Sequence, residues 1–155
     1  MSLRRFSMVS PSIWNSRRFA KLTNESKLLQ LYLITCGHQN SCGCFALPDL
    51  YACADLGWEL PQYQSARQEL IDAGLIAYGP EKSFVFVRKW FRHCSPANEK
   101  HKIGTLRLVS EIKDEAVRNE VVEEFNEAEE RRMPVPSSPL TQSTRLLEST
   151  VVRRK

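Results

Sequence analysis

The sequence predicts a mainly helical α+β fold, a winged helix-turn-helix with a small β-hairpin wing and further helices at its C-terminal end. Proline opens and glycine closes two consecutive short segments, residues 48–57 and 61–74, as is typical of helix boundaries. Helices joined by so short a turn cross steeply and present the second helix outward. The β-prone runs 75–78 and 84–87 then flank a Gly-Pro turn, which predicts a hairpin.

Size and composition predict one domain with a tail. The chain has 155 residues, of which 42% are hydrophobic, enough for one core. We expect a winged-helix domain over 1–112, an acidic helix over 113–132 and a disordered Pro- and Ser-rich tail over 133–155. No apolar run is long enough to span a membrane, and the N-terminal residues lack the apolar region of a secretory signal, so we expect a soluble protein. The expected location is the cytoplasm of a bacterium or of a phage-infected cell.

The N-terminal residues predict a short strand and a helix. Residues 5–9 alternate weakly between polar and apolar side chains, as a short strand does. A helix should begin near Ser10 and continue through Ile13, Trp14 and Phe19. We expect the aromatic side chains of this helix to anchor it in the core.

A central helix should follow over residues 24–36. Thr23 is suited to the N-cap and Glu25 to the positive end of the macrodipole. Leucine, tyrosine and isoleucine side chains cover more than one face of this helix, which predicts a place in the middle of the domain. Residues 43–46 should then add a third strand to the hairpin sheet.

The second helix of the pair is the predicted recognition helix. Apolar side chains recur at helical spacing on its core side, namely Tyr63, Ala66, Leu70 and Ala73. The predicted readers of the DNA major groove point outward: Gln62, Gln64, Ser65 and Gln68, flanked by Arg67. Gln and Arg pair bidentately with adenine and guanine, although any surface helix also carries such residues. Glu69 and Asp72 would repel phosphates, so the N-terminal end should enter the groove.

The distribution of charge predicts a phosphate footprint. The net charge is +4 and the pI about 8.9. Basic side chains gather at and after the hairpin, where Lys82 and Arg88 should hold phosphates from the wing. The footprint should then extend over Lys89, Arg92, Lys100 and Lys102. Residues 113–132 hold eight Asp and Glu against four Lys and Arg. We expect this acidic segment to stay away from the DNA.

Two further helices are predicted after the hairpin, with a junction near Lys113-Asp114. Their apolar positions recur at helical spacing, first at Ile103, Leu106, Val109 and Ile112 and then at Val117, Val121, Phe125 and Ala128. The second stripe has acidic flanks. It should pack on its own domain, and the alternative is the seam of a homodimer.

A cysteine-rich stretch raises the question of a metal. Cys36, His38, Cys42 and Cys44 lie within a short span, and thiolates with imidazole are the usual zinc ligands. Their spacing does not match the common C-x₂-C pairs, so we expect small apolar side chains and reduced thiols, with no metal and no cofactor. No glycine-rich phosphate loop, metal-binding helix or nucleophile elbow is present in the sequence, so no enzymatic activity is expected.

Several runs carry a resemblance to a known group of proteins. These are Ile13-Trp14, residues 40–49, residues 54–58 and residues 86–93 with Asn98. They resemble winged-helix proteins of phages and prophages, described as replication-initiation or DNA-binding proteins and related in fold to the N-terminal domain of DnaD-type proteins. The resemblance covers about residues 5–125 and implies a winged helix with no metal and no catalysis.

These observations predict a non-enzymatic protein that binds double-stranded DNA in replication initiation or its control. The alternative is a protein-interaction or oligomerisation module that assembles replication-machinery or host partners through the acidic helix and the tail. A small zinc-dependent regulator is the third hypothesis. Neither of the leading hypotheses involves a membrane.

Overall fold

The computed structural model describes residues 5–133, so all of the predicted tail except Met133 lies outside the described residues. The elements in chain order are η1 (Pro11–Asn15), α1 (Arg17–Ala20), α2 (Asn24–Thr35), β1 (Cys44–Ala46), α3 (Asp49–Leu56), α4 (Leu60–Asp72), β2 (Ile76–Gly79), β3 (Phe84–Val87), α5 (Trp90–His93), α6 (Glu99–Ser110) and α7 (Glu115–Arg132). The fold is mainly helical with one small antiparallel sheet. This arrangement confirms the α+β class that the sequence predicts. Within residues 5–133, no helix is both long and apolar enough to cross a bilayer.

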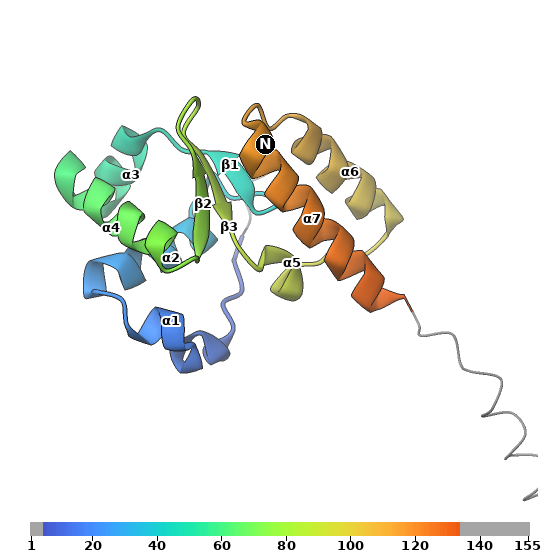
Figure 1. Ribbon diagram of the computed structural model, residues 1–155, viewed down its shortest axis with the longest axis horizontal. Coiled ribbons are helices and arrows are strands. Elements are labelled where there is room, and N and C mark those ends of the chain that lie inside the picture. Colours follow the sequence, from blue (N-terminus) through green and yellow to red (C-terminus); the bar gives the residue numbers. More distant parts are fainter. Residues whose placement is uncertain (1–4, 134–155) are drawn as a thin grey trace, which may run out of the picture.

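The sheet forms the middle layer of the molecule. Its strands lie in the order β1-β3-β2, with Cys44 opposite Phe86 and Ile76 opposite Val87. Figure 1 shows the sheet between α2 and α4 on one side and α7 and α6 on the other. Val85, Phe86 and Val87 are consecutive and all buried. Consecutive strand residues point to opposite faces, so both faces of this sheet are covered, and the β3 sequence is continuously apolar for that reason.

The helix pair α3–α4 follows the boundaries that the sequence predicts. Gly57 ends α3 in the left-handed conformation at φ +67°, and Pro61 lies in the first turn of α4. Pro48 takes the N-cap position of α3 rather than its first helical position. The connection between the two helices is therefore short, and α3 packs directly on α4.

A carboxylate from α4 completes the N-terminal cap of α2. Thr23 is the N-cap, as predicted, and its side chain accepts from the Ser26 amide. Glu69 accepts hydrogen bonds from the Thr23 amide at 2.9 Å, from the Thr23 hydroxyl at 2.6 Å and from the Ser26 hydroxyl. These bonds, from Ser26 first, lower the pKa of Glu69. Glu69 therefore joins α4 to α2, and its carboxylate is not free on the helix surface.

The N-terminal residues differ from the prediction. Residues 5–9 form no strand, and the predicted single helix is divided into η1 and α1 at Ser16, whose extended backbone (ψ 119°) interrupts the helix. Phe19 is buried, but Trp14 is 63% exposed and touches Phe19 edge to face at 5.3 Å. Phe19 alone of these two aromatic side chains is a core anchor.

The inner face of α6 is only partly the predicted one. Val109 and Ile112 are buried, whereas Ile103 and Leu106 are 64% and 42% exposed. Thr105 takes the inner position instead, and its hydroxyl bonds to Ser41 and to a backbone carbonyl of α6. A hydroxyl that has hydrogen-bond partners can be buried at little cost. The face of α6 that meets the core is therefore not its most hydrophobic face.

The apolar stripe of α7 is used inside the chain. Its predicted members, Val117, Val121, Phe125 and Ala128, are all buried in the same core as β3. Phe125 meets Phe91 of α5 edge to face, with ring centroids 5.2 Å apart. The stripe packs on its own domain, as the sequence favoured. The alternative of a homodimer seam along this stripe is wrong, because these side chains are no longer available to a partner.

The orientation of α4 gives the first testable prediction. Leu70 is completely buried, and Gln68 is exposed with one hydrogen bond to Asp72. Leu70→Ala should lower the free energy of unfolding by about 2–5 kcal/mol because it leaves a cavity. Gln68→Ala should change it by about 0.5 kcal/mol or less. Urea denaturation of both variants measures the difference, and equal losses would contradict this orientation.

Candidate nucleic-acid interface

The outward face of α4 carries an uncharged polar row, as predicted. Its members are the exposed side chains of Gln62, Gln64, Ser65 and Gln68. Residues three or four apart lie side by side on a helix, which places Gln64 beside Arg67 on the side of the hairpin. Gln62 lies two turns before Glu69, on the side of α2. Gln64 is thus the member of the row nearest the hairpin, while Gln68 and Ser65 face outward, away from the core.

Arg67 is held inside the fold. Its Nη1 lies 2.6 Å from Asp49 Oδ1 at the start of α3, and its guanidinium lies 4.0 Å from the ring centroid of Tyr78 on β2. It also lies 5.3 Å from the Tyr63 ring, and its side chain is only 14% exposed. Arg67 therefore ties α3, α4 and β2 together. The prediction that it flanks the groove readers on the surface is not what the structure shows.

The β-hairpin lies against the start of the acidic helix. Lys82 is exposed in the hairpin turn, beside Ser83 at φ +52°. At the end of β2, a Cβ added to Gly79 would overlap the side chain of Asp114, the N-cap of α7. The start of α7 thus lies directly against the hairpin (Figure 1). The acidic segment thus begins beside the hairpin, and the expectation that it stays away from the DNA stays a prediction.

The predicted phosphate footprint is divided in space. Lys89 and Arg92 are exposed, but they follow β3 at the end opposite the hairpin turn that holds Lys82 (Figure 1). Lys100 is exposed on α6, beyond α7. The structure therefore does not bring these four cations into one patch.

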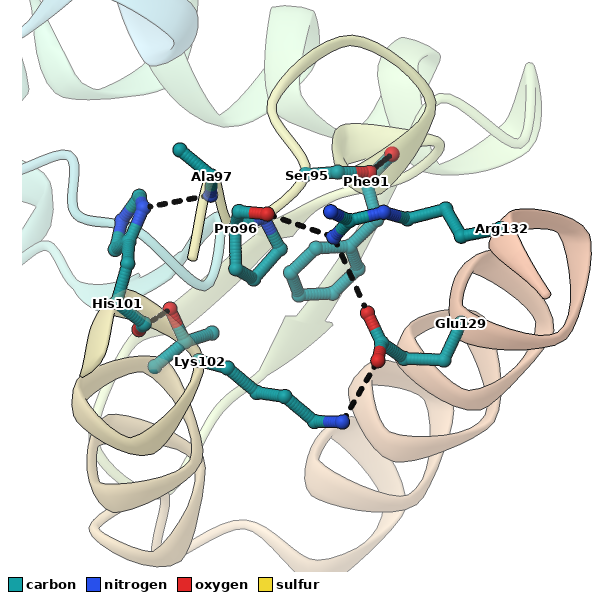
Figure 2. A network of polar contacts seen from close by, with 9 residues as sticks. Phe91, Ser95, Pro96, Ala97, His101, Lys102, Glu129 and Arg132 are labelled. Atoms are coloured by element: carbon teal, nitrogen blue, oxygen red, sulfur yellow. Dashed lines mark hydrogen bonds and ion pairs between the residues drawn. The ribbon is translucent and has the colours of Figure 1, made fainter. Parts of the chain in front are cut away.

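Lys102 is paired with a carboxylate between α6 and α7. Figure 2 shows its ammonium on Glu129, which also pairs with Arg132, while the Arg132 guanidinium donates to the carbonyl of Pro96. The Lys102–Glu129 distance is 2.7 Å. This pair raises the pKa of Lys102 and lowers that of Glu129. The network fixes the end of α7, and the charged Lys102 ammonium is engaged by Glu129 rather than offered to a phosphate.

Arg88 also forms an ion pair with a carboxylate of α7. Its Nε and Nη2 donate to the two oxygens of Glu120 at 2.9 and 3.1 Å, a bidentate pair. The pair lies in a cleft of about 660 Å³ whose walls hold the further cations Arg18, Lys89, Arg92 and Arg131 and the further carboxylates Asp72, Glu123, Glu124 and Glu127. The mixed charge makes this cleft a poor site for a polyanion. Sequence reasoning did not include Arg18 or Arg131, and no local signal places them here.

One carboxylate in this cleft is perturbed. Burial raises the pKa of Glu124 to about 7, and Glu127 adds to this. The hydrogen bond from the Lys89 amide and the charges of Arg92 and Arg131 act in the opposite direction. Glu124 therefore changes its charge near neutral pH, beside the cations that follow β3.

The cysteine-rich stretch is part of the core. Cys42 and Cys44 are buried, and the Cys42 thiol donates to Asn40 Oδ1 at 3.1 Å. Burial raises the pKa of Cys42 to about 11 and also raises that of Cys44. His38 lies against Tyr51 at a centroid distance of 5.7 Å. In residues 5–133, no group of three or more His, Cys, Asp or Glu side chains is placed to hold a metal ion.

Comparison with known proteins finds no match among protein-family models, curated proteins or solved structures.

The tie made by Arg67 can be measured. Arg67→Gln should lower the free energy of unfolding by about 2–3 kcal/mol, because it leaves Asp49 without its partner and removes the stack on Tyr78. A double-mutant cycle with Asp49→Asn should show coupling of about 1–3 kcal/mol in urea denaturation. Gln64→Ala, one turn away on the exposed face, is the control and should leave stability nearly unchanged. Zero coupling would show that the ion pair does not join α3 to α4.

Glu124 should make stability depend on pH. Between its ordinary pKa of 4.5 and about 7, the folded state binds more protons than the unfolded state, so stability falls as pH rises. Glu124→Gln should remove this fall and be more stable than the parent by on the order of 1–2 kcal/mol above pH 7. Thermal unfolding across this range measures the effect. Glu123→Gln, at an exposed position, is the control and should show the same pH dependence of stability as the parent. The same dependence in Glu124→Gln would disprove the raised pKa of Glu124.

Proposed function

We propose that this chain is a winged-helix protein that binds double-stranded DNA without catalysing a reaction. The observation that carries the proposal is the outward polar row of α4, set on a helix pair that is followed at once by a β-hairpin. In this arrangement the second helix lies in the major groove and the hairpin reaches the neighbouring backbone. Gln64, Ser65 and Gln68 are the proposed base readers, and Lys82 is the proposed phosphate contact of the hairpin.

The direction of approach follows from the charges on α4. Asp72 lies at its C-terminal end, and Glu69 faces α2, where it caps that helix. The N-terminal half of α4 carries no acidic side chain. Within α4, this half can therefore face the groove without a carboxylate, although the exposed Glu59 lies just before it at the N-cap.

The cationic contribution to binding should be small. Arg88 and Lys102 are paired with carboxylates of α7, and Lys89, Arg92 and Lys100 lie away from the hairpin turn. Few phosphates would then be neutralised, and the salt dependence of binding should be shallow. Affinity would come mainly from groove contacts. A role in phage or prophage replication initiation, or in its control, is part of the proposal and is supported by the resemblance of residues 5–125.

A second candidate function is assembly with another protein. Leu50 and Tyr51 on α3 are 72% and 59% exposed, and Ile103 and Leu106 form an exposed apolar pair on α6. Apolar side chains at such exposure are typical of contact surfaces when they are adjacent. This candidate places the contact on α3 or α6, since the apolar stripe of α7 is buried in the core.

Duplex titrations at several salt concentrations test the DNA proposal. Lys82→Ala should weaken binding to all duplexes alike and make the slope of log affinity against log salt shallower by about one unit, because one counterion release is lost. Gln64→Ala should change the discrimination between sequences by about 1–3 kcal/mol. Lys100→Ala, on α6, is the charge-matched control and should leave both quantities unchanged.

Two results would contradict the proposal. One is duplex affinity that neither Lys82→Ala nor Gln64→Ala alters. The other is equal losses for Lys82→Ala and Lys100→Ala, which would indicate attraction by net charge alone. Self-association in sedimentation that Ile103→Glu abolishes, together with absent duplex binding, would favour the assembly function instead.

A further inference from the structure

A cavity of about 360 Å³ lies below the sheet, apart from the proposed DNA contacts. The N-terminal segment, α2, the end of β3 and α5 form its walls, and no residue of α4 or of the hairpin turn lines it. Apolar side chains dominate these walls, among them Val9, Ile13, Ile34, Leu75 and Val87. The volume lies within the range of small-molecule sites, which are mostly apolar with a few placed polar groups.

One polar side chain in the wall has an oxygen atom without a hydrogen-bond donor among the described residues. Gln30 of α2 lines the cavity and is only 5% exposed, and its Oε1 has no hydrogen-bond donor among the described residues. A buried amide oxygen without a donor is unfavourable. This oxygen is shielded from solvent in the conformation described. The last torsion of glutamine is soft, and a turn about it would bring the oxygen to an N–H or O–H group inside the cavity.

The mouth of the cavity is cationic. Lys89 and Arg92 are exposed side chains that line it, together with the stem of Arg88, and no Asp or Glu is among its lining residues. Of these, Arg88 is paired with Glu120 and Arg92 feels the charge of Glu124. Arg88, Lys89 and Arg92 also line the cleft that holds the carboxylates of α7. On the cavity side no Asp or Glu is among the lining residues, so a ligand carboxylate at the mouth would be attracted to Lys89 and Arg92.

We propose that this cavity binds a small aromatic or aliphatic carboxylic acid that carries one hydrogen-bond donor in its apolar part. The apolar part fills the space below the sheet and its donor meets Gln30 Oε1. The carboxylate lies at the mouth beside Lys89 and Arg92. The site is independent of the proposed DNA contacts, because it shares no residue of α4 or of the hairpin turn.

Three matched probes test the chemistry on the full chain. Indoleacetate has the ring N–H and the carboxylate, naphthaleneacetate lacks the N–H, and tryptophol has an alcohol in place of the carboxylate. Indoleacetate should raise the melting temperature and bind in calorimetry, with the other two about tenfold weaker. No binding of indoleacetate at millimolar concentration, or equal affinity for all three, would overturn the proposal.

Variants locate the site. Gln30→Leu should reduce the affinity for indoleacetate to that for naphthaleneacetate and leave the latter unchanged. Lys89→Gln with Arg92→Gln should remove the preference for the carboxylate over the alcohol. Ile34→Trp should fill the cavity and abolish binding, whereas Leu28→Trp, exposed on the same helix and outside the cavity, should not. Unchanged affinity in Gln30→Leu would overturn the site even if Ile34→Trp does not fold.

Discussion

The structure depends on the burial of both faces of a very small sheet. Its strands have only three or four residues each, and so short a sheet is not stable in water by itself. The helices α2 and α4 cover one face, and α7 covers the other with Val117, Val121 and Phe125. The acidic helix is therefore an integral part of the domain. The N-cap residue of this helix, Asp114, also lies against Gly79 at the end of β2, so the helix borders the hairpin.

This packing determines how charge is distributed. Covering the sheet with α7 places its carboxylates next to the basic side chains that follow β3, and Arg88 and Lys102 become partners of Glu120 and Glu129. These pairs are partly exposed, so each contributes little to stability. Their larger effect is to offset the charge of two surface cations with carboxylates. Charge that is segregated along the sequence is thus mixed in space.

Local signals in the sequence predicted local structure well. The Pro and Gly boundaries, the Thr23 cap and the hairpin depend on interactions within a few residues, and all of them are present. The third strand is also present, although its partner β3 is distant in the sequence. The role of Arg67 was not predictable in this way, because Asp49 and Tyr78 meet it only after the chain has folded. The inner face of α6 was missed because Thr105 satisfies its hydroxyl there. For the candidate site, the outward row of α4 was predictable, but the separation of the cations was not.

The burial of the sheet by a late helix has a consequence for biosynthesis. Strand β3 is complete at Val87, but the helix that covers its second face ends only at Arg132. At roughly 5–20 residues per second, translation leaves that apolar face uncovered for several seconds. The hairpin can form early because its contacts are local, yet it cannot be buried until α7 has left the ribosome. The nascent chain therefore passes through a stage in which chaperones have an apolar surface to bind.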